Sequence, residues 1–320
     1  MIYSSILFAL LFVFVLSAVG TAVLDIIFRF LGKRGYLGNL FPNVRGGIPR
    51  AIGVVPFIVL SFYMLPGLNN LILIIGIFAL IDDIAGRRKS PFGIEWGQLS
   101  RGIGIILVMI VGFYEGLGIS SIFIALMVQP MNISDMQPGS TCIVTIIMCI
   151  LTILTMLIIG SPMYEELPAI YTPLLLLVVC IAYSPLDFAG KIMLGEVGNH
   201  VFGVALGISY YLMGGLAGVI VFGLITVALI AFVRRNNLQV FFRQRLGLVD
   251  PTFGDYFMDV LTGGGLGDLF RKWILADKQI VVTNPLLISL GFRRLLYNPY
   301  ASHIKRYTQR KEIPRLEKRG

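Results

Sequence analysis

The sequence predicts an all-α polytopic membrane protein, because it is strongly apolar and poor in charge. Of its 320 residues, 57% are hydrophobic and only 13% are charged, whereas roughly a quarter of the residues of an average soluble domain are charged. The mean hydropathy is +0.86, and long apolar runs recur along residues 1–233. Such runs are typical of helices that cross a bilayer. These features exclude an ordinary soluble enzyme.

Nine apolar segments are candidates for transmembrane helices. A helix needs about 20 residues to cross the hydrocarbon core, and several segments are shorter, so we expect those to be tilted, re-entrant or extended by flanking residues. Turn-forming pairs such as Pro66-Gly67 and Gly214-Gly215 separate neighbouring segments. The nine segments are 2–28, 47–65, 68–81, 102–115, 117–128, 141–159, 168–183, 198–213 and 215–233.

Basic residues lie in a few connections and in the C-terminal region. They occupy the connections 29–50, 82–101 and 184–197, and 16 of the 26 lie between Arg234 and Arg319. Because Lys and Arg are retained in cytoplasmic loops, these connections are predicted to share the cytoplasmic face. The net charge of +9 then reflects topology beside anionic lipid rather than a nucleic-acid partner, for which the sequence has no motif.

This distribution predicts two parts: a transmembrane catalytic domain at 1–233 and a basic cytoplasmic region at 234–320. Within the second part, residues 280–297 are apolar but are interrupted by Asn284-Pro285 and Arg293-Arg294. A tenth span here would move the basic tail at 305–319 outside. We therefore expect an interfacial or re-entrant element.

The first polar string ends an apolar segment with Asp82 and Asp83. Two adjacent carboxylates at a helix end are unfavourable unless a cation neutralises them. Mg²⁺ suits such a position, because it binds a few carboxylates and completes its coordination with water and phosphate oxygens. The alternative is a simple pair of helix-end charges beside Arg87 and Arg88.

Two further polar strings lie on the same predicted face. In the first, Asn132 and Asp135 precede Pro138-Gly139, so both side chains can face one ligand or only form a local turn. In the second, Glu196 begins a Gly-rich helix, whose N-terminal amides would attract phosphate. Helix packing through small residues explains those glycines equally well.

In this order, the strings resemble the signatures of the polyprenyl-phosphate N-acetylhexosamine-1-phosphate transferase superfamily (glycosyltransferase family 4). This superfamily includes the phospho-MurNAc-pentapeptide translocase and the WecA-type GlcNAc-1-phosphate transferases. The resemblance covers roughly residues 32–233. Asp82-Asp83 resembles the Asp-Asp signature, and the string from Asn132 to Asp135 resembles the Asn/Asp loop of compact bacterial members.

Two more segments carry the resemblance. Lys33 and the Gly-rich residues 45–50 resemble the basic N-terminal segment of the family. Residues 193–199 resemble its Met-Gly-Asp-x-Gly-Ser signature, but Glu196 stands in place of the usual Asp and Asn199 in place of Ser. The family's His-containing loop has no counterpart in this sequence.

The resemblance implies an Mg²⁺-dependent phosphotransferase that initiates a cell-envelope glycan. It would transfer a sugar-1-phosphate, of the N-acetylhexosamine class, from a UDP-sugar to a polyprenyl phosphate, giving polyprenyl-diphospho-sugar and UMP. Asp83 and Glu196 would hold Mg²⁺, Asp82 would position or deprotonate the lipid phosphate, and Asp135 would orient the nucleotide-sugar. The predicted substrate-binding residues are Asn132, Lys33, Arg50, Lys191 and Asn199.

Two other functions stay open. A transporter would use the same carboxylates as a cation or proton site, although they cluster at one face and the halves show no inverted repeat. A catalytically weakened relative would bind a lipid-linked sugar without transferring it, and Glu196 keeps this alternative open. The expected location is the plasma membrane, with a cytoplasmic active site and no nucleic-acid partner. A homodimer is left open.

Overall fold

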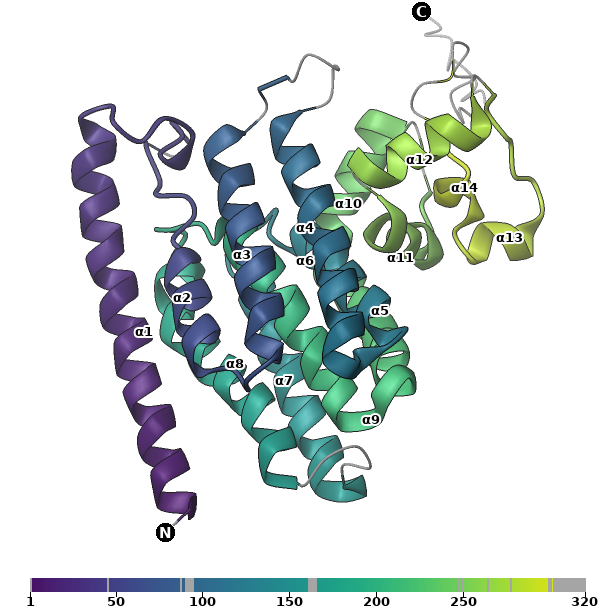
Figure 1. Ribbon diagram of the computed structural model, residues 1–320. Coiled ribbons are helices and arrows are strands. Elements are labelled where there is room, and N and C mark those ends of the chain that lie inside the picture. The colour runs from purple at the N-terminus through teal and green to yellow at the C-terminus, as the bar shows by residue number, and fades with distance from the viewer. Residues whose placement is uncertain are drawn as a thin grey trace, which may run out of the picture. The chain divides into compact units, whose positions relative to one another are not determined.

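The computed structural model describes a helical chain that divides into two compact units, Met1–Ile230 and Ala231–Gly320 (Figure 1). The sequence analysis placed the boundary at 233/234. Apart from one isolated bridge between Lys89 and Glu95, the described residues form helices, turns and loops. These residues are 2–44, 46–86, 88–89, 95–160, 166–246, 248, 250–263, 265–276, 278–298 and 301. Arg45, Arg87 and the basic tail at 305–319 lie outside them.

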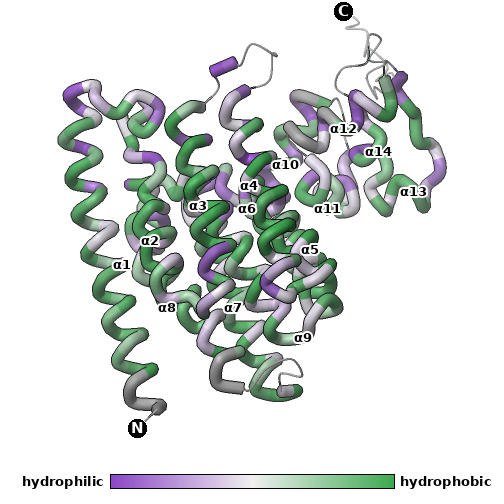
Figure 2. The backbone as a smooth tube through the Cα atoms, in the orientation of Figure 1, coloured by the Kyte–Doolittle hydropathy of each residue, from purple (hydrophilic) through white to green (hydrophobic). Residues whose placement is uncertain are grey.

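Six helices in the described part are long and apolar enough to cross a membrane. Figure 2 shows apolar residues along most of their lengths. Large side chains such as Phe8, Ile106 and Ile158 are exposed on them, and an apolar exterior of this extent suits lipid rather than water. The six are α1 (Ile2–Lys33), α3 (Leu68–Ala85), α4 (Trp96–Gly112), α7 (Ser140–Ile159), α8 (Glu166–Phe188) and α9 (Gly195–Val233).

The longest helix, α9, is a hairpin of two helical halves. Its backbone leaves helical geometry at Gly214 and Gly215, where Gly215 has φ 58°. Tyr210 and Thr226 are 16 positions apart, yet their hydroxyl oxygens lie 2.8 Å from each other. In a straight helix this separation would be about 24 Å. The chain therefore reverses at Gly214-Gly215, where the sequence predicted a break between two spans.

Other predicted spans correspond to shorter helices. The segment 47–65 contains only α2 (Val54–Tyr63), and 117–128 contains α5 (Ser120–Leu126). The string predicted as a polar turn is partly helical, because α6 (Val128–Ser134) includes Asn132. The remaining elements of this unit are the 3₁₀ helix η1 (Gly38–Leu40) and the π-helix η2 (Phe113–Leu117). The count of nine spans stays a prediction.

The second unit is a small helical fold with its own core. Phe242, Leu246, Leu248 and Tyr297 form a buried cluster. The predicted interfacial or re-entrant element at 280–297 contains two short helices, α13 and α14. The elements are α10 (Arg235–Phe241), η3 (Phe242–Leu246), α11 (Phe253–Thr262), α12 (Gly265–Leu275), α13 (Pro285–Ser289) and α14 (Phe292–Leu295).

Candidate active site

The end of α3 buries two carboxylates in a single turn. The helix ends because Gly86 adopts φ 58°, and its N–H donates to the carbonyl of Asp82 at 2.8 Å. The residue Asp83 is 0% exposed and Asp82 is 8% exposed. Buried carboxylates are unfavourable unless hydrogen bonds or cations compensate the loss of water. Both kinds of partner are present.

Asp83 is hydrogen-bonded to the start of α9. The backbone N–H of Glu196 donates to Asp83 Oδ1 at 3.1 Å, and that of Val197 donates to Oδ2 at 3.0 Å. Free amides and the helix dipole make a helix N-terminus a favourable partner for a carboxylate. Gly195 permits the approach: its φ is +75°, and a Cβ there would lie 2.7 Å from Asp83 Oδ2. Asp83 therefore joins α3 to α9.

Arg50 contacts two of the acids from the segment that precedes α2. Backbone hydrogen bonds of 2.9 and 3.1 Å join residues 49–53 to residues 193–194, which fixes this segment beside the start of α9. Arg50 Nε then lies 3.0 Å from Asp83 Oδ1, and Nη2 lies 3.4 Å from Glu196 Oε1. Arg50, predicted as a substrate-binding residue, thus lies beside two of the predicted acids.

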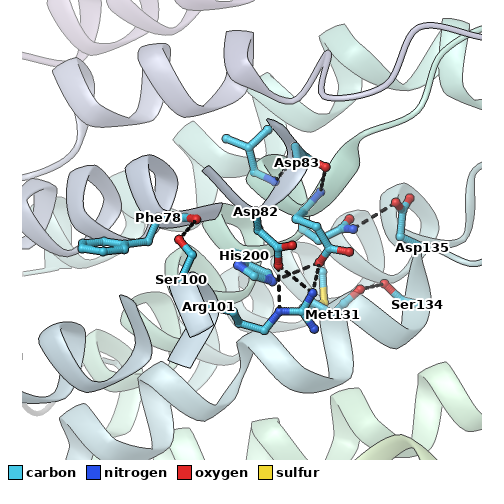
Figure 3. A network of polar contacts seen from close by, with 12 residues as sticks. Phe78, Asp82, Asp83, Ser100, Arg101, Met131, Ser134, Asp135 and His200 are labelled. Carbon is cyan, nitrogen blue, oxygen red and sulfur yellow. Dashed lines mark hydrogen bonds and ion pairs between the residues drawn. The ribbon is translucent and has the colours of Figure 1, made fainter. Parts of the chain in front are cut away.

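Arg101 reaches the same acids from α4. Its Nε and Nη2 donate to Asp82 Oδ2 at 3.2 and 2.9 Å, and Nη2 also donates to Glu196 Oε2 at 2.8 Å. Figure 3 shows the guanidinium beside Asp82 and His200. One turn earlier in α4, Gly97 makes room for this contact, because a Cβ there would overlap Asp82 Oδ1. Arg101 thus bridges two carboxylates that belong to different helices.

Glu196 is the centre of the cluster. Besides the two arginines, it is contacted by Asn132 of α6, whose amide nitrogen, in the orientation that satisfies both neighbours, donates to Glu196 Oε2 at 2.8 Å. In that orientation the amide oxygen of Asn132 accepts from Arg101 Nη1 at 2.6 Å. His200 Nε2 lies 3.3 Å from Glu196 Oε2, since residues four apart share one face of a helix.

Asp135 forms a separate pair next to a cavity. Asn199 Nδ2 donates to Asp135 Oδ2 at 2.9 Å, and burial raises the pKa of Asp135 well above its usual range. A cavity of about 150 Å³ lies beside this pair and is lined by Asp135, Asp187 and Met193 among others. Asp187 Oδ2 accepts the N–H of Gly139 at 3.1 Å.

The structure therefore separates the predicted residues into three groups. Asp82, Asp83, Asn132, Arg50 and Glu196 meet in the connected polar cluster. Asp135 and Asn199 form the neighbouring pair. Lys33 and Lys191 are exposed, and among the described residues no ion pair joins either of them to the acids. The hydrogen bonds of Lys191 are made by its backbone: its carbonyl accepts from Arg29 at 2.5 Å, and its N–H donates to the carbonyl of Leu186 at 3.0 Å.

Two members of the site, Arg101 and His200, were not predicted from the sequence. A signal for His200 was present, because it follows Glu196 by four residues and so lies on the same helix face. For Arg101 the signal was weaker: it is the one charged residue of α4 and lies in its second turn, and nothing local pairs it with Asp82.

The cluster has the donor chemistry that a hard cation requires. Asp82, Asp83 and Glu196 bring carboxylate oxygens together, and Mg²⁺ binds such oxygens, so these residues fit the ion. In this structure the carboxylate oxygens face guanidinium and amide N–H groups. Accordingly, the described part of the chain contains no group of three or more His, Cys, Asp or Glu side chains that could hold a metal ion. If all are ionised, three carboxylates and two guanidiniums leave one excess negative charge.

No protein-family model matches the chain, and no curated protein matches it. The geometry of the cluster and its surroundings is therefore the basis for a functional proposal.

Proposed function

We propose that the protein transfers a sugar-1-phosphate from a UDP-sugar to a polyprenyl phosphate. The observation that carries the proposal is the meeting of three polar strings, far apart in the sequence, in one cluster. Asp82 and Asp83 come from α3, Asn132 from α6 and Glu196 from α9, and hydrogen bonds or ion pairs connect all of them. In a chain of apolar helices, so many ionisable groups in one place point to a functional site.

The proposed reaction exchanges one phosphorus–oxygen bond for another. An oxygen of the polyprenyl phosphate attacks the phosphorus that carries the sugar, and the bond from that phosphorus to the bridging oxygen of UMP breaks. UMP leaves with the bridging oxygen, so the charges balance without a net proton transfer. This chemistry asks a protein mainly for positioning and for neutralisation of charge.

The residues of the cluster have matching roles in this proposal. Asp82 positions the lipid phosphate, and Arg50 and Arg101 supply positive charge beside it. Asp83 and Glu196 would hold Mg²⁺, which when bound would neutralise charge on the diphosphate. Asp135 and Asn199, next to the cavity, orient the nucleotide-sugar. Asn132 acts through Glu196, whose carboxylate it contacts.

We place the site at the cytoplasmic face of the plasma membrane. The end of α3 and the start of α4 lie at the same end of the first unit as the last turn of α1 (Figure 1), and the last turn of α1 contains Lys33. Basic residues favour the cytoplasmic side. A site at helix ends would let the nucleotide arrive from water while the polyprenyl tail stays in lipid.

A panel of UDP-sugars tests the proposal. Purified protein with Mg²⁺, polyprenyl phosphate and each radiolabelled UDP-sugar should form a labelled lipid and release UMP with at least one of them. Asp82→Asn should reduce the rate at least ~100-fold, because the carboxylate that would position or deprotonate the lipid phosphate is lost. Glu115→Gln is the matched control, since Glu115 contacts Asn70 outside the cluster. No labelled lipid with any sugar, or full activity in Asp82→Asn, would refute the proposal.

One observation favours the second candidate, a protein that binds lipid-linked sugars without turnover. The acids expected to bind metal are instead bound to arginines and backbone amides. The same panel separates the two functions: this candidate binds a labelled sugar lipid and releases no UMP. The transporter alternative has less support, because the acids lie at helix ends rather than at the middle of the helices.

A further inference from the structure

Arg101 occupies the position between two carboxylates where a cation would be expected. Its side chain is only 14% exposed and contacts Asp82 Oδ2 and Glu196 Oε2 at 2.9 and 2.8 Å. Asn132 supplies an oxygen to the same guanidinium at 2.6 Å. Arg101 is therefore held on three sides by acceptors from α3, α6 and α9.

The guanidinium and a divalent cation compete for the same oxygens. A guanidinium carries one permanent charge and five N–H donors, whereas a divalent cation brings two charges and needs direct oxygen ligands. Both cannot bind Glu196 Oε2 at once, since positive charges a few ångströms apart repel in a partly buried site. Arg50, which contacts Asp83 and Glu196, adds to this repulsion.

A displaced guanidinium would still have a partner if the cation arrived with phosphate groups. The planar fork of Arg matches two phosphate oxygens as well as it matches a carboxylate. A diphosphate that arrives with the cation would offer such oxygens to the released guanidinium. Arg101 would then exchange its ion pairs with carboxylates for ion pairs with phosphate oxygens.

We propose that Arg101 is a phosphate-binding residue whose guanidinium is paired with Asp82 and Glu196 until a divalent cation and a diphosphate bind together. Asp83 and Glu196 would then hold the cation, and the guanidinium of Arg101 would bind oxygens of the diphosphate. This inference deepens the proposed function and rests on it. Its consequence is that the cation and the diphosphate bind synergistically, each weakly alone.

Binding of Mn²⁺, followed by electron paramagnetic resonance, tests the inference without turnover. The full chain in lipid nanodiscs is titrated with Mn²⁺ alone and with Mn²⁺ in the presence of UDP, after correction for the Mn²⁺ that UDP binds in solution. In the wild type, UDP should tighten Mn²⁺ binding at least ~10-fold. In Arg101→Gln, Mn²⁺ alone should bind at least ~10-fold more tightly than in the wild type, because a competing charge is gone. UDP should then tighten Mn²⁺ binding much less than it does in the wild type.

Two further variants keep the result interpretable. Arg101→Lys retains the charge but lacks the fork, so Mn²⁺ alone should bind as weakly as in the wild type while the gain from UDP falls. Arg34→Gln is the matched control, because Arg34 stacks on Phe30 outside the cluster, and it should match the wild type in both titrations. If Arg101→Gln fails to fold, the Arg101→Lys result decides.

The outcomes distinguish this inference from the proposed function. Equal Mn²⁺ affinity in Arg101→Gln and the wild type, or no effect of UDP in the wild type, would overturn the role of Arg101 even if labelled lipid forms. Synergistic binding that depends on Arg101, in a protein that transfers no sugar, would support the exchange and overturn only the transferase activity.

Discussion

Replacement of Asp83 by Asn should destabilise the protein as well as inactivate it. Asp83 accepts two N–H groups at the start of α9 and is paired with Arg50. An Asn side chain can offer only one oxygen, so its NH₂ group would face one of the two α9 amides, and Arg50 would lose its buried partner. Removal of a carboxylate from a helix N-terminus costs up to about 2 kcal/mol, and removal of one partner of a buried pair costs about 3–5 kcal/mol.

The second cost is smaller here, because the Arg50 side chain is 31% exposed and keeps Glu196 as a partner. We therefore expect Asp83→Asn to lower the free energy of unfolding by about 2–4 kcal/mol. For a unit of this size the melting temperature should fall by about 5–15 °C. Thermal unfolding of purified protein measures the shift, with Glu115→Gln as the control. Asp82→Asn should give a smaller shift, because Arg101 keeps Glu196 and Asn132 as partners. A fall of less than about 2 °C in Asp83→Asn would show that Asp83 does not join α3 to α9.

Two more predictions concern the neighbourhood of the cluster. Gly53→Ala should cost about 1–3 kcal/mol and lower activity, because its Cβ would lie 2.5 Å from both Leu194 O and Gly198 Cα. Gly102→Ala, which meets nothing within 4 Å, should be neutral or stabilising in the same melting assay. Burial raises the pKa of Asp135, so the carboxyl group of Asp135 binds its proton more tightly in the folded protein than in the unfolded chain. Stability should therefore fall as the pH rises above about 3.9, the ordinary value. The melting temperature should fall between pH 5 and pH 8 in the wild type and should fall less in Asp135→Asn. An equal fall in the two proteins would contradict the prediction.

The helical, membrane-like character of the chain was predictable from composition and local pattern. Apolar runs and their breaks depend on neighbouring residues, and the break at Gly214-Gly215 was predicted from two adjacent glycines. The extents of α2 and α6 were not predictable in this way. The segment before α2 is not helical, and its backbone is hydrogen-bonded to residues 193–194, which are distant in the sequence.

The site was predictable as a set of acids but not as a set of contacts. Asp82, Asp83 and Glu196 stood out because carboxylates are rare beside apolar helices. Their partners did not, because Arg101 is 95 positions from Glu196 and Arg50 is 146 positions from it. No local rule relates residues so far apart.

The sequence by itself determined that this protein is helical and apolar, and where its unusual charges lie, because these properties follow from each residue and its neighbours. Only the tertiary structure decided which charges meet. It assigned Asp83 to the start of α9 and placed Arg101 between Asp82 and Glu196. The physical reason is that a buried charge is stable only beside a partner, and the fold determines which partner that is.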